Sequence, residues 1–392
     1  MKRILLCMGT RPEIIKMAPV HDALRRRAAA GAAVQPLVLH TGQHDEMAAP
    51  LYRFFEMPPD FALTPRRRGA SLAHLSASVL EQSAEAIERA APDVVLVQGD
   101  TSSALCCALA AFYARIPVGH VEAGLRTYEV DPFPEEKNRE LVGRLAAWHF
   151  TPTDQATRNL KQERAAGIVR QVGNTIVDAV ELGLRRLAGR PLADVDPSDP
   201  AVRALDAFLA ARSDRRLMLV TAHRRENWGE PMQRIAQAVG RLARARPDLA
   251  WVWPLHQNPQ VQATVRGELQ ALAEGDRAPL LLTPPLNYPA LLAVLARTTL
   301  ILTDSGGIQE EAATLRRPVI VLRESTERQE LIDAGGGVLA GTSVDAIIGA
   351  TARILDDASV YAAMQVRENP FGDGRTSERI VDVLLGTDKG AA

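Results

Sequence analysis

Short apolar runs alternate along this chain with longer segments in which apolar residues recur at helical spacing. The runs are continuous and rich in Val, Ile and Leu, which is typical of strands buried on both faces of a parallel sheet. In the first half they predict strands at residues 4–8, 36–39, 94–97, 118–121, 148–150 and 169–172. In the second half they predict strands at residues 217–221, 251–253, 280–282, 300–302, 319–322 and 337–339.

Helical segments such as 72–90 and 231–245 lie between the predicted strands. Two series of about six strands alternating with helices indicate an α/β protein with two doubly wound Rossmann-like domains. The junction is expected after residues 172–175, and the Pro- and Asp-rich residues 188–200 are expected to form a surface loop. Ligands of such sheets bind beyond the carboxyl ends of the strands, so we expect a central cleft that both domains face.

Composition and charge narrow the class of protein. The 392 residues are 46% hydrophobic and 24% charged, as in globular proteins. Lys and Arg number 46 against 47 Asp and Glu, which excludes a general binder of nucleic acid or membrane surfaces. The cysteines, Cys7, Cys106 and Cys107, lack the spacing of a disulfide framework or zinc site. No apolar run reaches the ~20 residues of a membrane span, and no leader pattern is complete, so a cytoplasmic protein is expected.

The loop after the first strand combines a helix start with two cations. Thr10 and Glu13 have the spacing of a capping box, which explains them without any ligand. Capping does not explain Arg11 and Lys16, because cations are unfavourable at the positive end of a helix. A bound anion would explain both. The loop is not G-x-G-x-x-G, so a nicotinamide cofactor is not supported.

Three carboxylates lie at strand ends or helix starts of the first half. Asp100 could be a helix cap, Glu122 could pair with Arg126, and Glu135 could pair with Arg139 one turn later. As a group bordering one cleft, they instead suit acid/base chemistry.

The second half offers groups suited to phosphate. His223 follows a predicted strand and is itself followed by two arginines, which can donate to phosphate oxygens. Ser305, Gly306 and Gly307 form a turn between a strand and a helix, where backbone N–H groups suit a diphosphate. Glu311, about a turn further on, could accept hydrogen bonds from ribose hydroxyls, although an ordinary glycine-rich turn remains an alternative. No histidine spacing indicates a metal, so none is assigned.

Taken together, these segments resemble the non-hydrolysing UDP-N-acetylglucosamine 2-epimerases. The matching runs are residues 9–16, 41–44, 98–101, 120–126, 134–136, 173–175, 223–227, 254–259, 304–311, 323–328 and 369–374. The resemblance implies a fold of the GT-B type with no cofactor and no metal. It also implies that a C-terminal helix returns to the first domain. The expected domains are therefore residues 1–173 plus 359–385, and residues 174–358.

The resemblance implies interconversion of UDP-GlcNAc and UDP-ManNAc by anti elimination of UDP to 2-acetamidoglucal and re-addition. UDP-ManNAc in turn usually supplies bacterial surface polysaccharides. By motif, the catalytic residues are Asp100, Glu122, Glu135 and His223. The expected UDP-binding residues are Arg11, Lys16, Ser305, Gly306, Gly307, Glu311 and Arg328. Variants Asp100→Asn, Glu122→Gln and His223→Ala are expected to fold but lose activity by at least ~100-fold. A homodimer is expected.

Gln43, His44 and Glu136 correspond to a region that borders a regulatory substrate site in bacterial members. Asp45 and Glu46 replace the Arg and Gln often found there, which leaves such activation open. Four alternatives also stay open. They are a relative acting on a UDP-2,3-diacetamido uronic acid, a hydrolysing epimerase, a GT-B glycosyltransferase, and a nucleotide-sugar sensor without activity.

Overall fold

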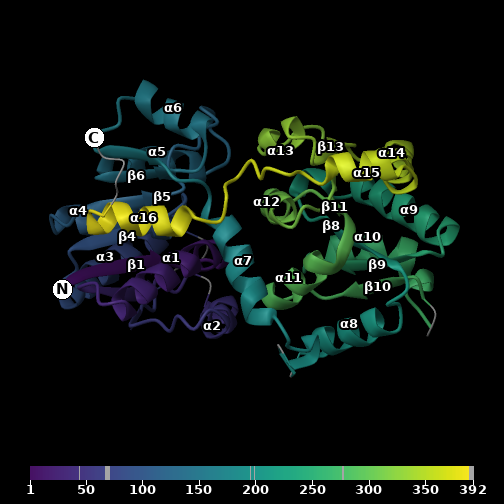
Figure 1. Ribbon diagram of the computed structural model, residues 1–392, viewed down its shortest axis with the longest axis horizontal. Coiled ribbons are helices and arrows are strands. Elements are labelled where there is room, and N and C mark those ends of the chain that lie inside the picture. Colours follow the sequence, from purple (N-terminus) through teal and green to yellow (C-terminus); the bar gives the residue numbers. More distant parts are fainter. Residues whose placement is uncertain (44, 67–70, 195, 198, 276–277, 388–392) are drawn as a thin grey trace. The chain divides into compact units, whose positions relative to one another are not determined.

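The computed structural model describes residues 1–43, 45–66, 71–194, 196–197, 199–275 and 278–387. The chain divides into two compact units. The first unit comprises Met1–Leu182 and the chain from Phe371 onward, and the second comprises Gly183–Pro370. Each unit contains one parallel sheet with helices on its faces, which confirms the predicted α/β class with two doubly wound domains (Figure 1).

Within the described ranges, the sheet of the first unit has seven strands in the order β3-β2-β1-β4-β5-β6-β7. The strands are β1 (Lys2–Met8), β2 (Val34–His40), β3 (Phe61–Ala62), β4 (Val94–Gln98), β5 (Val118–Val121), β6 (Trp148–Thr151) and β7 (Ile168–Gln171). The helices are α1 (Arg11–Ala29), α2 (Asp45–Phe54), α3 (Leu72–Ala90), α4 (Ser102–Tyr113), α5 (Glu135–Leu145), α6 (Asp154–Gln162) and α16 (Thr376–Leu385). All strand pairs are parallel. The order reverses between β1 and β4, the kind of switch point where open α/β sheets bind ligands.

Helix α16 closes the first unit by packing on α1. Asp178 accepts hydrogen bonds from the backbone N–H groups of Ser377, at 2.7 Å, and Thr376, at 3.3 Å, and so caps the start of α16. Arg27 of α1 forms an ion pair with Asp382 of α16. A carboxylate at the N-terminus of a helix and a buried apolar face together fix the returning segment.

The expected domain bounds differ from those of the two units. The junction falls within α7 (Thr175–Leu187), because the first turns of this helix, including Asp178, are bonded to the first unit. Helix α15 (Ala358–Met364), which was expected to return, stays with the second unit instead. Met364 lies in the core of that unit, and the Tyr361 hydroxyl donates to the carbonyl of Thr299 at 3.1 Å. The return therefore begins at Phe371.

The described part of the second unit has six parallel strands in the order β10-β9-β8-β11-β12-β13. The strands are β8 (Arg216–Thr221), β9 (Leu249–Pro254), β10 (Leu280–Thr283), β11 (Thr298–Thr303), β12 (Val319–Val321) and β13 (Gly337–Leu339). The further helices are α8 (Pro200–Ala210), α9 (Glu230–Ala245), α10 (Pro259–Leu269), α11 (Tyr288–Arg297), α12 (Gly306–Thr314), α13 (Gln329–Asp333) and α14 (Val344–Asp356), with 3₁₀ turns η1 (Leu192–Asp194), η2 (Arg225–Asn227) and η3 (Gln270–Leu272). Trp251 and Trp253 are fully buried in this core.

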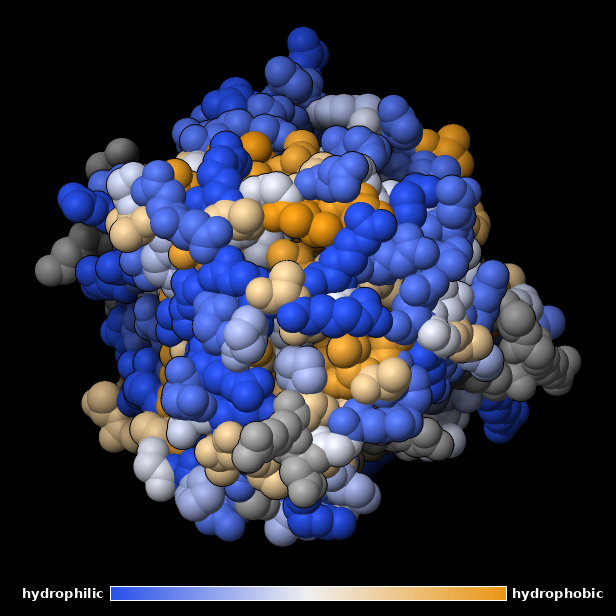
Figure 2. Space-filling view, turned by 90° about the vertical axis from the view of Figure 1, so that its right-hand side faces the viewer, coloured by the Kyte–Doolittle hydropathy of each residue, from blue (hydrophilic) through white to orange (hydrophobic). Residues whose placement is uncertain are grey.

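One face of the second unit is largely hydrophilic. Figure 2 shows hydrophobic side chains on it as separate areas that are interrupted by polar ones. The predicted surface loop 188–200 contains η1, whose Leu192 is buried. No helix in the described ranges is long and apolar enough to cross a membrane.

Candidate active site

The predicted acid/base carboxylates of the first unit follow neighbouring strands. Asp100 comes after β4, Glu122 comes after β5, and Glu135 begins α5, while β4 and β5 pair side by side. The charges of Glu122, Glu135, Lys16 and Arg139 all act on the carboxyl of Asp100. The structure thus brings the three predicted carboxylates and two cations into one cluster.

Glu122 is buried and bonded through both carboxylate oxygens. Its Oε1 accepts from Lys16 Nζ at 2.6 Å and from Asn174 Nδ2 at 3.2 Å. Its Oε2 accepts from Gln98 Nε2. The side chains of Lys16 and Glu122 are only 10% and 7% exposed, so each charge depends on the other for compensation.

Lys16 therefore has a contact that the sequence did not predict. We expected it to bind UDP, and the structure places its ammonium group on a catalytic candidate instead. Its role as a diphosphate ligand stays a prediction, as does that of Arg11, the half-buried first residue of α1. Nearby, Glu13 accepts from the backbone N–H groups of Gly9 and Thr10 and from the Thr101 hydroxyl, which ties the starts of α1 and α4 together.

Neither of the ion pairs considered as alternative roles for Glu122 and Glu135 is present among the described residues. Arg126 is bound to Glu163 by two hydrogen bonds of 2.7 and 2.8 Å rather than to Glu122. Arg139 contacts the backbone carbonyl of Glu135 at 3.4 Å, while its ion pairs go to other carboxylates. The two candidates are therefore not accounted for by ordinary helix pairing.

A strained turn after β5 positions Glu122. Glu122 has a φ of 63° and Gly124 a φ of 89°, both in the left-handed region. The turn is held from α6, because Asn159 Nδ2 donates to the carbonyl of Gly124 at 2.9 Å. A Cβ at position 124 would lie 2.3 Å from the carbonyl oxygen of Ala156, so only glycine fits there.

Gly124→Ala is expected to lower the free energy of unfolding by at least about 2 kcal/mol, because it adds a backbone clash to the strain of a positive φ. Urea denaturation measures this loss. Gly31→Ala is the matched control, since Gly31 has a φ of 92° but no atom within 4 Å of the added carbon. The control should lose only about 1–2 kcal/mol. Equal losses in the two variants would show that the contact with Ala156 is not important.

Asp100 is placed in surroundings that favour its protonated form. Burial is the largest cause and raises the pKa of Asp100 to about 6, while the charge of Arg139 opposes the shift and those of Glu122 and Glu135 add to it. Its side chain remains 26% exposed, and Arg139 Nη2 lies 3.0 Å from Oδ2. A carboxyl with a pKa close to neutrality can both accept and donate a proton under ordinary conditions.

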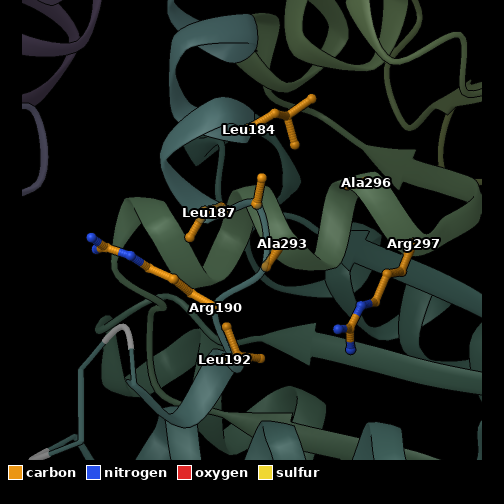
Figure 3. A pocket seen from close by; sticks show the side chains of 8 residues that line it. Leu184, Leu187, Arg190, Leu192, Ala293, Ala296 and Arg297 are labelled. Atoms are coloured by element: carbon orange, nitrogen blue, oxygen red, sulfur yellow. The ribbon is translucent and has the colours of Figure 1, made fainter.

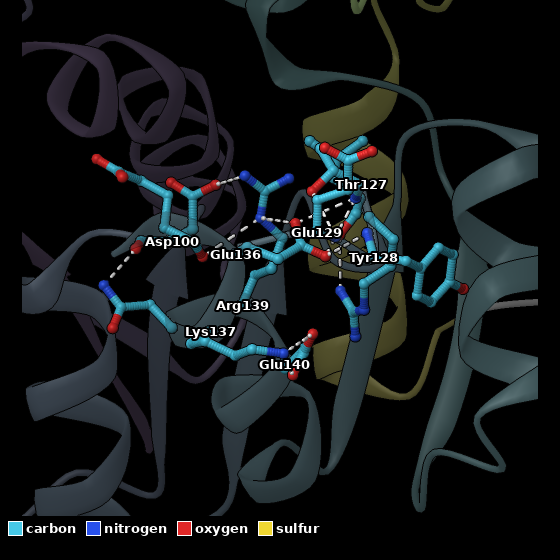
Figure 4. A network of polar contacts seen from close by, with 12 residues as sticks. Asp100, Thr127, Tyr128, Glu129, Glu136, Lys137, Arg139 and Glu140 are labelled. Atoms are coloured by element: carbon cyan, nitrogen blue, oxygen red, sulfur yellow. Dashed lines mark hydrogen bonds and ion pairs between the residues drawn. The ribbon is translucent and has the colours of Figure 1, made fainter. Parts of the chain in front are cut away.

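Arg139 connects Asp100 to the loop before α5 (Figure 4). Its Nε lies 3.6 Å from Oε2 of Glu136, whose side chain is fully buried. Glu136 in turn accepts hydrogen bonds of 3.0–3.1 Å from the backbone N–H groups of Thr127 and Tyr128. The structure thus gives Glu136 a role in holding this loop, and its expected regulatory role stays a prediction.

The other two residues of the expected regulatory set lie before α2. Gln43 Oε1 accepts from the Ser103 hydroxyl at 2.6 Å, and that hydroxyl also contacts Thr41 Oγ1 at 2.7 Å. Gln43 is thereby tied to the start of α4. His44 lies outside the described residues.

In the second unit, Asp304 organises the loop that carries His223. Its Oδ2 accepts three hydrogen bonds of 2.9 Å, from the backbone N–H groups of His223 and Arg224 and from Asn227 Nδ2. Its Oδ1 lies 3.2 Å from His223 Nδ1. Burial alone would raise the pKa of Asp304, but the hydrogen bonds and charge of His223, together with Arg224 and Asn227, outweigh it and lower the pKa. Asp304 is therefore an ionised, fully buried carboxylate.

The glycine-rich turn lies where a helix begins. Ser305 precedes α12, and Gly306 and Gly307 are its first residues. The guanidinium carbon of Arg328 lies 3.3 Å from where a Cβ on Gly306 would be, and Glu310 Oε1 holds Arg328 Nε at 2.8 Å. The backbone N–H groups at the start of α12 and the guanidinium group beside Gly306 are donors of the kind that bind a phosphate. Glu311 is buried, and its expected contact with ribose stays a prediction.

An apolar hollow of about 200 Å³ in the second unit lies apart from these groups. The end of α7, η1 and α11 line it through Leu184, Leu187, Leu192 and Ala293, with Arg190 and Arg297 at its margins (Figure 3). None of the predicted site residues lines this hollow. Within the described ranges, no group of three or more His, Cys, Asp or Glu side chains could hold a metal ion.

Four residues that position the candidates are not among the predicted site residues. They are Gln98 and Asn174 beside Glu122, Arg139 beside Asp100, and Asp304 beside His223. Gln98, Asn174 and Asp304 lie inside the runs that carry the family resemblance, which was the available signal. Their partners could not be known, because each contact joins segments far apart along the chain.

Comparisons with known proteins agree over nearly the whole chain. A family model described as UDP-N-acetylglucosamine 2-epimerase matches residues 26–385. A probable UDP-N-acetylglucosamine 2-epimerase of Ralstonia solanacearum is 42% identical, with 98% of this chain and 99% of the relative covered. The UDP-N-acetylglucosamine 2-epimerase of Escherichia coli K12 is 40% identical, covering 97% and 98%. The crystal structure of UDP-GlcNAc 2-epimerase from Neisseria meningitidis bound to UDP-GlcNAc matches with a TM-score of 0.83 and 36% identity, covering 98% of this chain and 100% of that one.

Two doubly wound units that match these structures define an α/β enzyme of the GT-B type. Within this class the chain belongs to the UDP-N-acetylglucosamine 2-epimerase family, and it is an epimerase. The family predicted from the ordered sequence motifs is confirmed.

Proposed function

We propose that this enzyme interconverts UDP-GlcNAc and UDP-ManNAc by inverting C2 through elimination and re-addition of UDP. The observation that carries the proposal is the pair of carboxyls with contrasting surroundings. Glu122 is held beside the ammonium group of Lys16, while burial gives Asp100 a pKa of about 6. Neighbouring carboxyls in different environments are suited to removing a proton on one side and returning it on the other. A relative that binds UDP-GlcNAc supports the choice of substrate.

The chemistry explains why both cations and carboxylates are needed. The C2 proton is not adjacent to a carbonyl, so it becomes labile only as the C1–O bond breaks and positive charge develops at C1. The bond electrons leave with UDP, a carboxylate takes the C2 proton, and the C1–C2 double bond of 2-acetamidoglucal forms. UDP then adds back to C1 while a carboxyl returns a proton to the opposite face of C2.

The proposed roles follow from this sequence. Asp100, Glu122 and Glu135 form the acid/base group, and His223 stabilises the departing diphosphate. Arg11, Ser305, Gly306, Gly307, Glu311 and Arg328 bind UDP, with Lys16 contributing positive charge beside Glu122. The expected homodimer stays a prediction.

Incubation with UDP-GlcNAc in deuterated water, followed by NMR, tests the function. The expected product is UDP-ManNAc carrying deuterium at C2, because the carboxyl that returns the proton exchanges with solvent. Release of free ManNAc would indicate a hydrolysing epimerase. An absence of both exchange and product would overturn the proposal and favour a transferase or a modified UDP-sugar as substrate.

A further inference from the structure

The surroundings of His223 restrict its ring on several sides. Nδ1 faces Asp304 Oδ1 at 3.2 Å, and the ring of His256 stacks on one face, with centroids 5.9 Å apart and an interplanar angle of 18°. The backbone is also fixed, because Trp228 Nε1 donates to the carbonyl of His223 at 3.1 Å. Among the described residues, no side chain or backbone group bonds to Nε2 of His223. The side chain is 42% exposed.

Asp304 is held in a fixed position beside His223. Its side chain is fully buried, and Oδ2 already accepts three hydrogen bonds from the loop that carries His223. The remaining oxygen, Oδ1, is buried with its capacity to accept unused, and it lies 3.2 Å from Nδ1 of His223. A carboxylate that accepts from one ring nitrogen determines which tautomer the neutral ring adopts and stabilises the protonated ring.

We propose that Asp304 is the positioning residue of His223: it accepts from Nδ1–H, so that Nε2 is the nitrogen presented to the leaving diphosphate, and its charge stabilises the imidazolium form. The inference rests on the proposed function for the role of His223. The expected state of the ring follows from the geometry alone and needs no substrate.

The charged groups around the His223 ring either favour or disfavour its protonated form. Asp304 favours the imidazolium, whereas the neighbouring Arg224 and any proton on His256 disfavour it. Burial is the largest cause that lowers the pKa of His256, and the charge of His223 lowers it further, against the opposing charge of Asp304. Burial and the charge of His223 thus both disfavour a proton on His256.

Nitrogen-15 NMR of ring-labelled protein without substrate tests the assignment, with His223→Gln used to identify the signals of His223. The wild-type ring should carry its proton on Nδ1 above its titration midpoint. In Asp304→Asn the midpoint should fall by at least about one pH unit. A wild-type ring protonated on Nε2 would overturn the proposal, and this result does not depend on whether the variant folds.

Asn227→Ala is the matched control for a purely structural role. Asn227 Nδ2 donates to Asp304 Oδ2 and to the carbonyl of Leu322, so the variant loosens the same loop but keeps the Asp304 charge beside Nδ1. Its His223 midpoint should stay within about 0.3 units of wild type, a shift that is small beside the effect of an opposite charge. An equal shift in both variants would overturn the proposal. Failure of the deuterium experiment together with the expected NMR result would overturn the proposed function alone.

Discussion

Replacing Asp100 by Asn is expected to lower kcat for the proposed epimerisation at least about 100-fold, because an amide can neither take nor return the C2 proton. The side chain keeps its size, and Arg139 retains its contact with Glu136. Initial rates of UDP-ManNAc formation measure the effect. Asp214→Asn is the control, since Asp214 is exposed and belongs to the second unit, in the turn before β8. Turnover near that of wild type would remove Asp100 from the catalytic residues.

The same substitution should increase stability at neutral pH. The pKa of Asp100 rises from 3.8 to about 6 on folding, so the folded chain binds this proton more tightly than the unfolded chain does. The resulting stabilisation is fully present below the unfolded value and is lost as the pH rises through the folded one. Asn does not titrate, so the stability of the variant does not fall with pH for this reason.

Relative to wild type, Asp100→Asn should therefore gain on the order of 2–3 kcal/mol in free energy of unfolding between about pH 4 and pH 7. Urea denaturation at the two pH values measures the difference, and Asp214→Asn should show almost none. If Asp100→Asn instead lost stability relative to wild type at the higher pH, the ion pair of Asp100 with Arg139 would outweigh the effect of burial. In that case Asp100 would be an ordinary structural carboxylate.

The strands were predictable because a parallel sheet covered on both faces needs continuous apolar runs. The predicted run at 94–97 is β4 without its last residue, and the predicted helix at 72–90 is α3. The missed strand, β3 (Phe61–Ala62), has only two residues and pairs at the edge of the sheet through Leu39 and His40. Such a strand depends on its partner rather than on a pattern of its own.

The sequence allowed us to predict which residues belong to the site, but not which residues they contact. Asp100, Glu122 and His223 could be found because each follows a strand, and strand ends gather at one edge of a sheet. Their partners could not be found in this way. Lys16 and Glu122 lie on different segments of the first unit, and Asp304 reaches His223 from the end of β11. No local sequence pattern shows which charged residues contact one another in the folded chain.

The buried pair of Lys16 and Glu122 changes what should be expected of Glu122→Gln. From the sequence alone this variant should fold normally, but the structure shows that it would leave the ammonium group of Lys16 buried beside a neutral amide. Breaking a buried ion pair from one side typically costs about 3–5 kcal/mol. Glu122→Gln and Lys16→Met should each lose stability of about this size, and each should lose at least about 100-fold in kcat.

The double variant Lys16→Met, Glu122→Gln separates the structural role from the chemical one. It removes both charges, so its loss of stability should be well below the sum of the two single losses, while its activity should stay as low as that of Glu122→Gln. The exposed pair of Lys137 and Glu140, at 2.8 Å, is the control, and Lys137→Met should cost less than about 1 kcal/mol. Additive losses in the double variant would show that the two charges do not depend on each other. Recovered turnover would show that Glu122 does not move the proton, because a chain with Gln at position 122 has no carboxylate there to do so.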